Sequence, residues 1–166
     1  MFRRHSEQIY ITSLVDNNKY LVNNTHKKHE VSDAIAKLNQ NMKSLMERLS
    51  NKEIKKKLED RTQNTEFMEN AKKFPPKKET SYTVNKGDRI VLCVVDYATM
   101  ELYDMNTLMY VVIHELAHIA NDTIGHDDSF YSIFNYLLQE SIFTGIYSFY
   151  NFDKLPLRYC GLELKK

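Results

Sequence analysis

The sequence predicts a single α+β domain that is rich in helix and contains a small β-hairpin. Its length of 166 residues, 42% of them hydrophobic, is that of one domain with one core. Apolar residues recur at spacings of three and four along several segments, as they do on amphipathic helices. Another segment has two apolar runs on either side of a glycine-containing turn, which is typical of a hairpin.

Residues 1–79 are predicted to form a basic and mainly helical region. A small hairpin or an ordered loop is expected over residues 12–24, where an Asp-Asn-Asn-Lys sequence separates two apolar runs. Apolar periodicity predicts one helix over residues 31–49 and a second, weaker one over residues 52–74. The second helix is expected to end at the Pro-Pro pair 75–76, because proline has no backbone N–H to donate.

Residues 80–166 are predicted to form the core that carries the chemistry. A hairpin is expected over residues 80–97, with its turn at an Asn-Lys-Gly-Asp sequence. A helix is predicted over residues 104–124, with an aspartate cap at its start and a glycine that stops it. Another helix is predicted over residues 128–145, and the proline-containing tail, residues 150–164, is expected to be irregular.

The net charge of +1 argues against a generally basic nucleic-acid binder, but the charge is uneven along the chain. Residues 1–79 carry 17 Lys and Arg against 11 Asp and Glu, whereas residues 80–166 carry 6 against 11. The simplest interpretation of the first region is a solvated basic helix face. The alternative is a surface through which the basic N-terminal helices contact DNA or a DNA-bound protein.

The chain is predicted to work inside a cell, in the cytoplasm or the nucleus, without a membrane partner. Its N-terminus lacks the apolar run of a secretory signal, and no segment reaches the roughly 18 apolar residues of a membrane span. The two cysteines, Cys93 and Cys160, are too few for a disulfide framework and too far apart for a Cys-x-x-Cys motif. Both are therefore predicted to be reduced, buried thiols.

Residues 114–118 read His-Glu-Leu-Ala-His within a predicted helix that is otherwise apolar. Residues four apart on a helix have Cβ atoms about 5–6 Å apart, so His114 and His118 are predicted to bind one metal ion. Composition alone would produce only about 0.015 such motifs in this chain, so the motif is a specific signal. The alternative is a pair of core histidines satisfied by hydrogen bonds. Burying these histidines and Glu115 in an apolar helix without a metal would leave polar groups unpaired, at a cost of several kcal/mol.

A catalytic zinc site usually has three protein ligands and a water, so a third ligand is needed. His126 is the first choice, because the preceding Gly125 lets the chain turn back toward the helix. Glu140 and Asp122 are the alternatives. Asp122 and Asp127 are interpreted instead as residues that orient a ligand imidazole through its other nitrogen. The three remaining histidines lie in polar sequence and are expected at the surface: His5, His26 and His29.

This set of side chains predicts metal-assisted hydrolysis. Zinc lowers the pKa of a bound water to about 7, and Glu115 is then expected to take the water proton and pass it to the leaving amine. The strand over residues 89–95 is expected to bind an extended peptide by edge pairing. Four residues are candidate donors to the oxyanion: Tyr97, Tyr103, Arg158 and Tyr159.

The sequence HELAHIANDTIGHDDSFYSIF resembles zincin metallopeptidases of the WLM and SprT-like kind, and its His126-Asp127 pair with Phe130 matches the WLM ending. Over residues 16–164 the chain is similar to small zincin-like proteins of nucleocytoplasmic large DNA viruses, through KYLVNN, TSYTVNKGDRIVLC and the ending around Tyr159-Cys160-Gly161. The resemblance implies a compact minimal zincin-like domain, with a hairpin beside the motif helix. If the chain is viral, it implies a location in the host cell.

The leading prediction is therefore a zinc metallopeptidase that acts on proteins or peptides, including, by analogy with cellular relatives, DNA-associated proteins. A second interpretation is a binding module in which the metal is structural and the basic helices contact nucleic acid or a protein. A third is a metal-free interaction protein. Glu115 favours the first interpretation, because a purely structural site does not need a base beside an open metal position.

Overall fold

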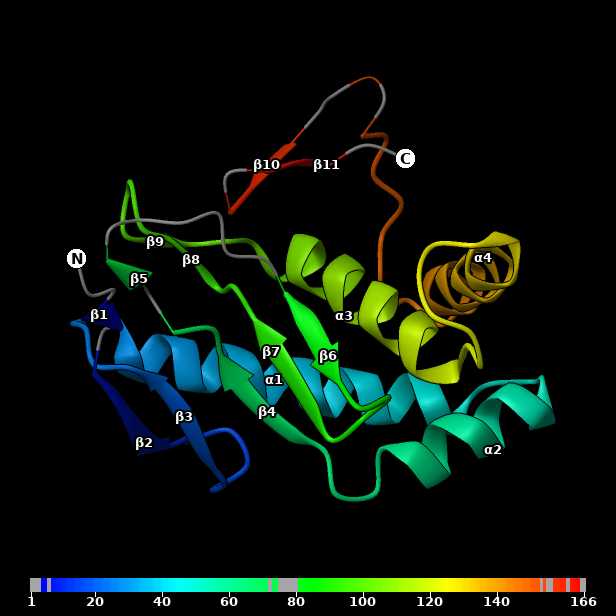
Figure 1. The fold of residues 1–166 in the computed structure, drawn as a ribbon, viewed down its shortest axis with the longest axis horizontal. Coiled ribbons are helices and arrows are strands. Elements are labelled where there is room, and N and C mark those ends of the chain that lie inside the picture. The colour runs from blue at the N-terminus through cyan, green and yellow to red at the C-terminus, as the bar shows by residue number, and fades with distance from the viewer. Residues whose placement is uncertain are drawn as a thin grey trace.

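The computed structural model describes residues 4–5, 7–71, 73–74, 81–152, 154, 157–160 and 162–164. Within these ranges the chain forms four helices, a central five-stranded sheet and three short two-stranded sheets (Figure 1). This arrangement confirms the predicted α+β class.

The central sheet has the strand order β2-β3-β4-β7-β6. Pairing is antiparallel between β2 and β3 and between β7 and β6, and it is parallel on both sides of β4. The two edges of the sheet are therefore β2 and β6. The strands are β2 (Gln8–Thr12), β3 (Lys19–Asn23), β4 (Glu66–Glu69), β6 (Tyr82–Val84) and β7 (Arg89–Leu92).

The four helices are α1 (Lys28–Glu47), α2 (Lys52–Arg61), α3 (Met105–Ala120) and α4 (Asp128–Phe143). Helix α1 covers one face of the sheet and contacts α3, which in turn contacts α2 and α4 (Figure 1). Their shared core includes fully buried side chains of α1, β7 and α3, among them Ile35, Leu38, Ile90, Leu92, Leu108 and Leu116. Among the described helices, none combines the length and apolar character that a membrane span needs.

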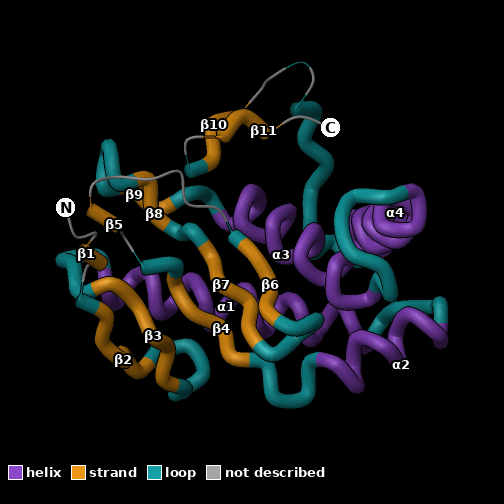
Figure 2. The backbone as a smooth tube through the Cα atoms, in the orientation of Figure 1, coloured by secondary structure: helices purple, strands orange, loops and turns teal. Residues whose placement is uncertain are grey.

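Three short sheets lie apart from the central one (Figure 2). They join β1 (Arg4–His5) to β5 (Lys73–Phe74), β8 (Val95–Asp96) to β9 (Glu101–Leu102), and β10 (Leu157–Tyr159) to β11 (Leu162–Leu164). The last pair corrects the prediction of an irregular tail.

Several predicted elements are confirmed, namely the helices α1 and α4 and the β6–β7 hairpin. A first hairpin is also present, but its first strand is β2, which precedes most of the predicted range 12–24, and residues 13–18 form its loop. The prediction of a helix over residues 52–74 was wrong after Arg61, because residues 66–69 pair with β7 in the sheet. Helix α3 ends at Ala120, before Gly125, since Asn121 already has an extended backbone. The Pro-Pro pair 75–76 lies outside the described residues.

The central sheet contains strands from both sides of the predicted boundary at residue 79. Strands β2, β3 and β4 precede this position and β6 and β7 follow it, yet all five form one sheet. The first region is consequently not purely helical, and it supplies three of the strands on which the later region is built.

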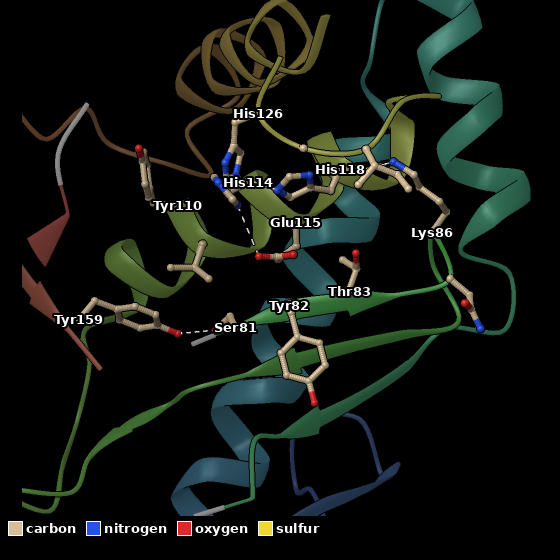
Figure 3. Close-up of a pocket in the computed structure, with 14 residues that line it drawn as sticks. Ser81, Tyr82, Thr83, Lys86, Tyr110, His114, Glu115, His118, His126 and Tyr159 are labelled. Carbon is tan, nitrogen blue, oxygen red and sulfur yellow. Dashed lines mark hydrogen bonds and ion pairs between the residues drawn. The ribbon is translucent and has the colours of Figure 1, made fainter. Parts of the chain in front are cut away.

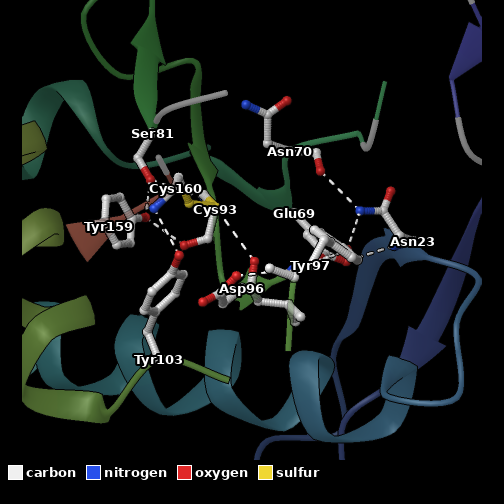
Figure 4. Close-up of a disulfide and its surroundings, with 12 residues drawn as sticks. Asn23, Glu69, Asn70, Ser81, Cys93, Asp96, Tyr97, Tyr103, Tyr159 and Cys160 are labelled. Carbon is white, nitrogen blue, oxygen red and sulfur yellow. Dashed lines mark hydrogen bonds between the residues drawn. A yellow bond between two sulfur atoms is a disulfide. The ribbon is translucent and has the colours of Figure 1, made fainter. Parts of the chain in front are cut away.

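Cys93 and Cys160 form a disulfide, with Cα atoms 6.5 Å apart (Figure 4). The prediction of two reduced thiols was therefore wrong. The two positions are 67 residues apart in sequence, and only the return of β10 to the end of β7 brings them together. Neighbouring contacts support this return: the Tyr159 hydroxyl donates to the Cys93 carbonyl, and the Cys160 amide donates to the Tyr103 hydroxyl.

Candidate metal centre

Helix α3 carries the His-Glu-Leu-Ala-His motif. Asp104 caps its N-terminus by accepting a hydrogen bond from the Thr107 amide at 3.0 Å, which satisfies one of the unpaired donors of the first turn. Most of the helix is buried in the core. His114 and His118, four residues apart, are only partly buried and line one cleft.

The loop after α3 returns His126 to the same place. Gly125 has a φ of +94°, a left-handed conformation that side chains disfavour. Asp127 then caps α4 by accepting from the Phe130 amide at 2.9 Å, and it also accepts from the side chains of Thr123 and Asn121. The glycine turn and the aspartate cap flank His126 and hold it next to α3.

The three imidazoles form a compact cluster (Figure 3). One nitrogen from each of His114, His118 and His126 lies within 4.8 Å of the others, and the Nε2 atoms of His118 and His126 are 3.1 Å apart. Two nitrogens bound to a tetrahedral zinc at 2.0–2.1 Å are separated by about 3.3 Å. The separation of His118 and His126 is already close to this value, and a set of three imidazole donors suits a zinc ion.

The protonation of the cluster also suits a metal. Burial, followed by the nearby His114 and His126, lowers the pKa of His118 to about 4. Burial and the neighbouring His114 likewise lower the pKa of His126. Both rings are therefore neutral near pH 7, and the neutral imidazole is the form that binds metals.

Phe130 packs against the imidazole rings of all three histidines. Its ring is fully buried, stacks on His118 at a centroid distance of 4.3 Å, and contacts the edges of His114 and His126 at 5.1 and 4.9 Å. The sequence placed Phe130 on the apolar face of a predicted helix and in a family pattern, without a role at the metal site. Its position in the first turn of α4, four residues after His126, is the signal that points to this supporting role.

Glu115 lies beside the cluster and is almost fully buried, with 3% of its surface exposed. Its carboxylate is 3.4 Å from Nδ1 of His114 and points toward strand β6 (Figure 3). Burial raises the pKa of this carboxyl, and the contact with His114 opposes the shift. The result is a carboxylate that accepts a proton more readily than an exposed one.

A cleft of about 840 Å³ opens in front of the cluster. Its walls come from β6 and the following turn, from α3, from the His126 loop and from Tyr159. Strand β6 is the edge of the central sheet, whereas β7 is paired on both sides. The expectation that residues 89–95 offer a free edge was therefore wrong, and β6 is the strand that borders the cleft. Tyr110 lines the cleft one turn before His114, a helical spacing that could have identified it from the sequence.

Of the four predicted oxyanion donors, only Tyr159 lines the cleft. Tyr97 donates to Glu69, and the Tyr103 hydroxyl accepts from the Cys160 amide. Arg158 is exposed and lies outside the residues that line the cleft. Tyr159 does line it, but its hydroxyl is engaged by Ser81 and by the Cys93 carbonyl.

The two aspartates have different partners from those predicted. Asp122 forms ion pairs with Lys57 at 2.9 Å and Arg61 at 2.8 Å, and these lower its pKa to about 2. Asp127 is occupied by the cap and loop contacts described above. Among the described residues, the partners of the two aspartates are these groups and not an imidazole, so the structure does not supply the orienting contacts that the sequence suggested.

The remaining predicted residues lie outside the cluster. Glu140, an alternative third ligand, accepts a hydrogen bond from Ser50 toward the other end of α4. His26 and His29 are exposed, as predicted. The side chain of His5 is not among those described.

Comparisons with known proteins agree with this fold. The WLM domain family matches residues 39–154, more than half of the chain. An uncharacterized protein of Acanthamoeba polyphaga mimivirus is 34% identical over 165 residues, covering 96% of this chain and 83% of the relative. An uncharacterized protein of Invertebrate iridescent virus 3 is 49% identical over 67 residues, covering 40% of this chain and 42% of the relative.

The crystal structure of Wss1 from Saccharomyces cerevisiae is similar in fold, with a TM-score of 0.56 and 20% identity over 75% of this chain and 88% of that chain. The predicted likeness to WLM proteins and to viral proteins is thus confirmed. On the extent of the family match and of the mimivirus similarity, the chain belongs to the WLM domain family.

Proposed function

We propose that the chain is a zinc-dependent peptidase, with His114, His118 and His126 as metal ligands and Glu115 as the general base. The observation that carries this proposal is the convergence of three imidazoles beside a buried carboxylate at the wall of an open cleft. When bound, zinc would polarise the scissile carbonyl and make a water more acidic. A structural zinc site, in contrast, is closed by four protein ligands.

Glu115 supplies the proton transfer. Its raised pKa lets the carboxylate take a proton from the attacking water and later give it to the leaving amine. Helix α3 holds the side chain rigidly, because its backbone is packed in the core on both sides of the motif. The position between the imidazoles and β6 would bring the carboxylate next to a substrate in the cleft (Figure 3).

The proposed substrate is a protein or peptide segment in extended conformation. Strand β6 pairs with β7 on one side and borders the cleft on the other, so an extended chain would add to the sheet as a further strand. The cleft side chains Tyr82, Tyr110 and Val111 would contact apolar side chains of the substrate. The proposal does not require the substrate to have a charged side chain at a particular position.

A further part of the proposal is action on DNA-associated proteins, with the basic helices contacting DNA. Ion pairs within the structure reduce the number of cations on α2 that could make such a contact. Lys57 and Arg61 are both paired with Asp122, and Lys55 is 3.9 Å from Glu59. These pairs support the simpler interpretation of α2 as a solvated helix face. Any DNA contact would have to use the remaining cations of the N-terminal region.

The test compares the wild type with Glu115→Gln and His126→Ala. Purified wild-type chain should hold one zinc per molecule and cleave casein. Glu115→Gln should keep the zinc but lose at least about 100-fold in rate, because it removes a general base. His126→Ala should lose zinc and activity together. A wild type prepared with zinc that binds none would contradict the proposal, as would a Glu115→Gln variant that cleaves at the wild-type rate.

A further inference from the structure

Lys86 joins the two chain segments that carry His118 and His126. It lies in the turn of the β6–β7 hairpin, and its ammonium group donates to the His118 carbonyl at 2.8 Å and to the Thr123 carbonyl at 2.7 Å. The first acceptor is in the last turn of α3, and the second is in the loop that leads to His126. Figure 3 shows the side chain reaching from the hairpin to the end of the motif helix.

The turn that carries Lys86 is itself held in place. Asn85, Lys86 and Gly87 all have positive φ values, of 49°, 55° and 129°. A Cβ at Gly87 would lie 2.2 Å from the Arg61 carbonyl oxygen, so the turn is in close contact with the end of α2. The position from which the lysine reaches is therefore set by the packing of the hairpin against α2.

The physical need for this contact lies at the end of α3. The last carbonyls of a helix have no partner within the helix, and the negative end of its dipole favours a cation. Lys86 donates to the His118 carbonyl, and Arg61 donates to the carbonyl of the next residue, Ile119, at 2.7 Å. Lys86 differs from Arg61 because its single ammonium group donates to two segments: the backbone of the ligand residue His118 and the backbone of the loop that follows α3.

We propose that Lys86 is a positioning residue of the metal centre, which sets the separation of His118 and His126 by holding the backbone of both segments. This inference rests on the proposed zinc site. Two backbone anchors on one ammonium group restrict how far the loop and helix end move apart. Losing them would let the 3.1 Å approach of the two Nε2 atoms relax, and zinc would have to restore it on binding.

The experiment measures zinc affinity of the full chain by competition with a chromogenic chelator. Lys86→Met should bind zinc about 10- to 100-fold more weakly than the wild type, the usual effect of removing a group that orients a ligand. Lys86→Arg, which keeps the charge and the donors, should recover most of the affinity. The matched control is Lys55→Met, which removes a cation of α2 that pairs with Glu59 and donates to the Glu47 carbonyl, neither of which lies in the ligand segments; it should bind zinc as the wild type does.

A second measurement separates positioning from general stabilisation. The visible absorption of the cobalt-substituted protein depends on ligand geometry, and Lys86→Met should change its bands while Lys55→Met leaves them unaltered. If Lys86→Met does not fold, Lys86→Gln, which keeps one N–H donor group, replaces it and should show a smaller loss of affinity.

The outcomes distinguish the two proposals. A wild type without zinc binding contradicts the proposed function itself. Zinc binding by the wild type together with equal affinity and equal cobalt spectra in the Lys86 variants leaves the zinc site intact and overturns the positioning role. Lower stability of the metal-free Lys86 variants without weaker zinc binding would make Lys86 a structural residue and would overturn it as well.

Discussion

At the scale of single residues, the site combines neutral imidazoles with a buried carboxylate. His118 is surrounded by Phe130 and two other imidazoles, and this surrounding disfavours its charged form. Glu115 is affected in the opposite sense, since burial raises its pKa. Both shifts act in the direction that the proposed chemistry needs, because the metal ligands have to be neutral and the base has to accept a proton from water.

The lowered pKa of His118 is directly measurable. In the metal-free chain, an NMR titration of the imidazole protons should give a midpoint of about 4 for His118, compared with the ordinary value of about 6.5. Between these two values the unfolded chain binds a proton at this ring and the folded chain does not. The folded state therefore loses stability from this residue as the pH falls through that window. A midpoint near 6.5 would contradict the shift.

At the scale of elements, β6 is the strand on which substrate binding depends. Cleavage of an extended peptide should be sensitive to its backbone as well as to its side chains. A peptide N-methylated beside the scissile bond should be cleaved about fivefold more slowly than the unmethylated peptide of the same sequence, because one lost hydrogen bond costs roughly 1 kcal/mol. The ratio of kcat/KM values is the measurement, and equal values would argue against strand addition to β6.

The disulfide makes β10 an integral part of the fold. It joins Cys93 at the end of β7 to Cys160 in the tail, next to the cleft residue Tyr159. Cys160→Ser should lower the free energy of unfolding by about 2–4 kcal/mol, the usual contribution of a disulfide. Urea unfolding with and without reductant is the test. The wild type should be destabilised by reductant and the variant should not; a wild type indifferent to reductant would contradict the prediction.

At the scale of the whole molecule, zinc would tie the buried helix α3 to the loop that leads into α4, so zinc binding should stabilise the fold. With free zinc about 1,000-fold above its Kd, the gain is about 4 kcal/mol. Adding a chelator to the zinc-loaded wild type should therefore lower its Tm, which calorimetry measures. Glu115→Gln should show the same decrease because it keeps all three ligands, whereas His126→Ala should show none. An unchanged Tm in the wild type would argue against a zinc site of this strength.

The sequence alone determined the features that depend on local spacing. The four-residue separation of His114 and His118 places both on one face of a helix, and this follows from helix geometry without any knowledge of the fold. The glycine before His126 indicated the return of the chain in the same way. Apolar periodicity predicted α1, α3 and α4, because each of these helices has one side in the core.

The tertiary structure decided the features that depend on partners distant in the chain. Residues 66–69 form a strand because β3 and β7 flank them, although their own sequence is compatible with a helix. Asp122 binds the cations of α2 and Cys93 meets Cys160 for the same reason, since neither partner is near in sequence. Contacts between residues that are distant in sequence are set by the packing of the sheet and helices. The composition of a short segment does not indicate which distant segment will pack against it.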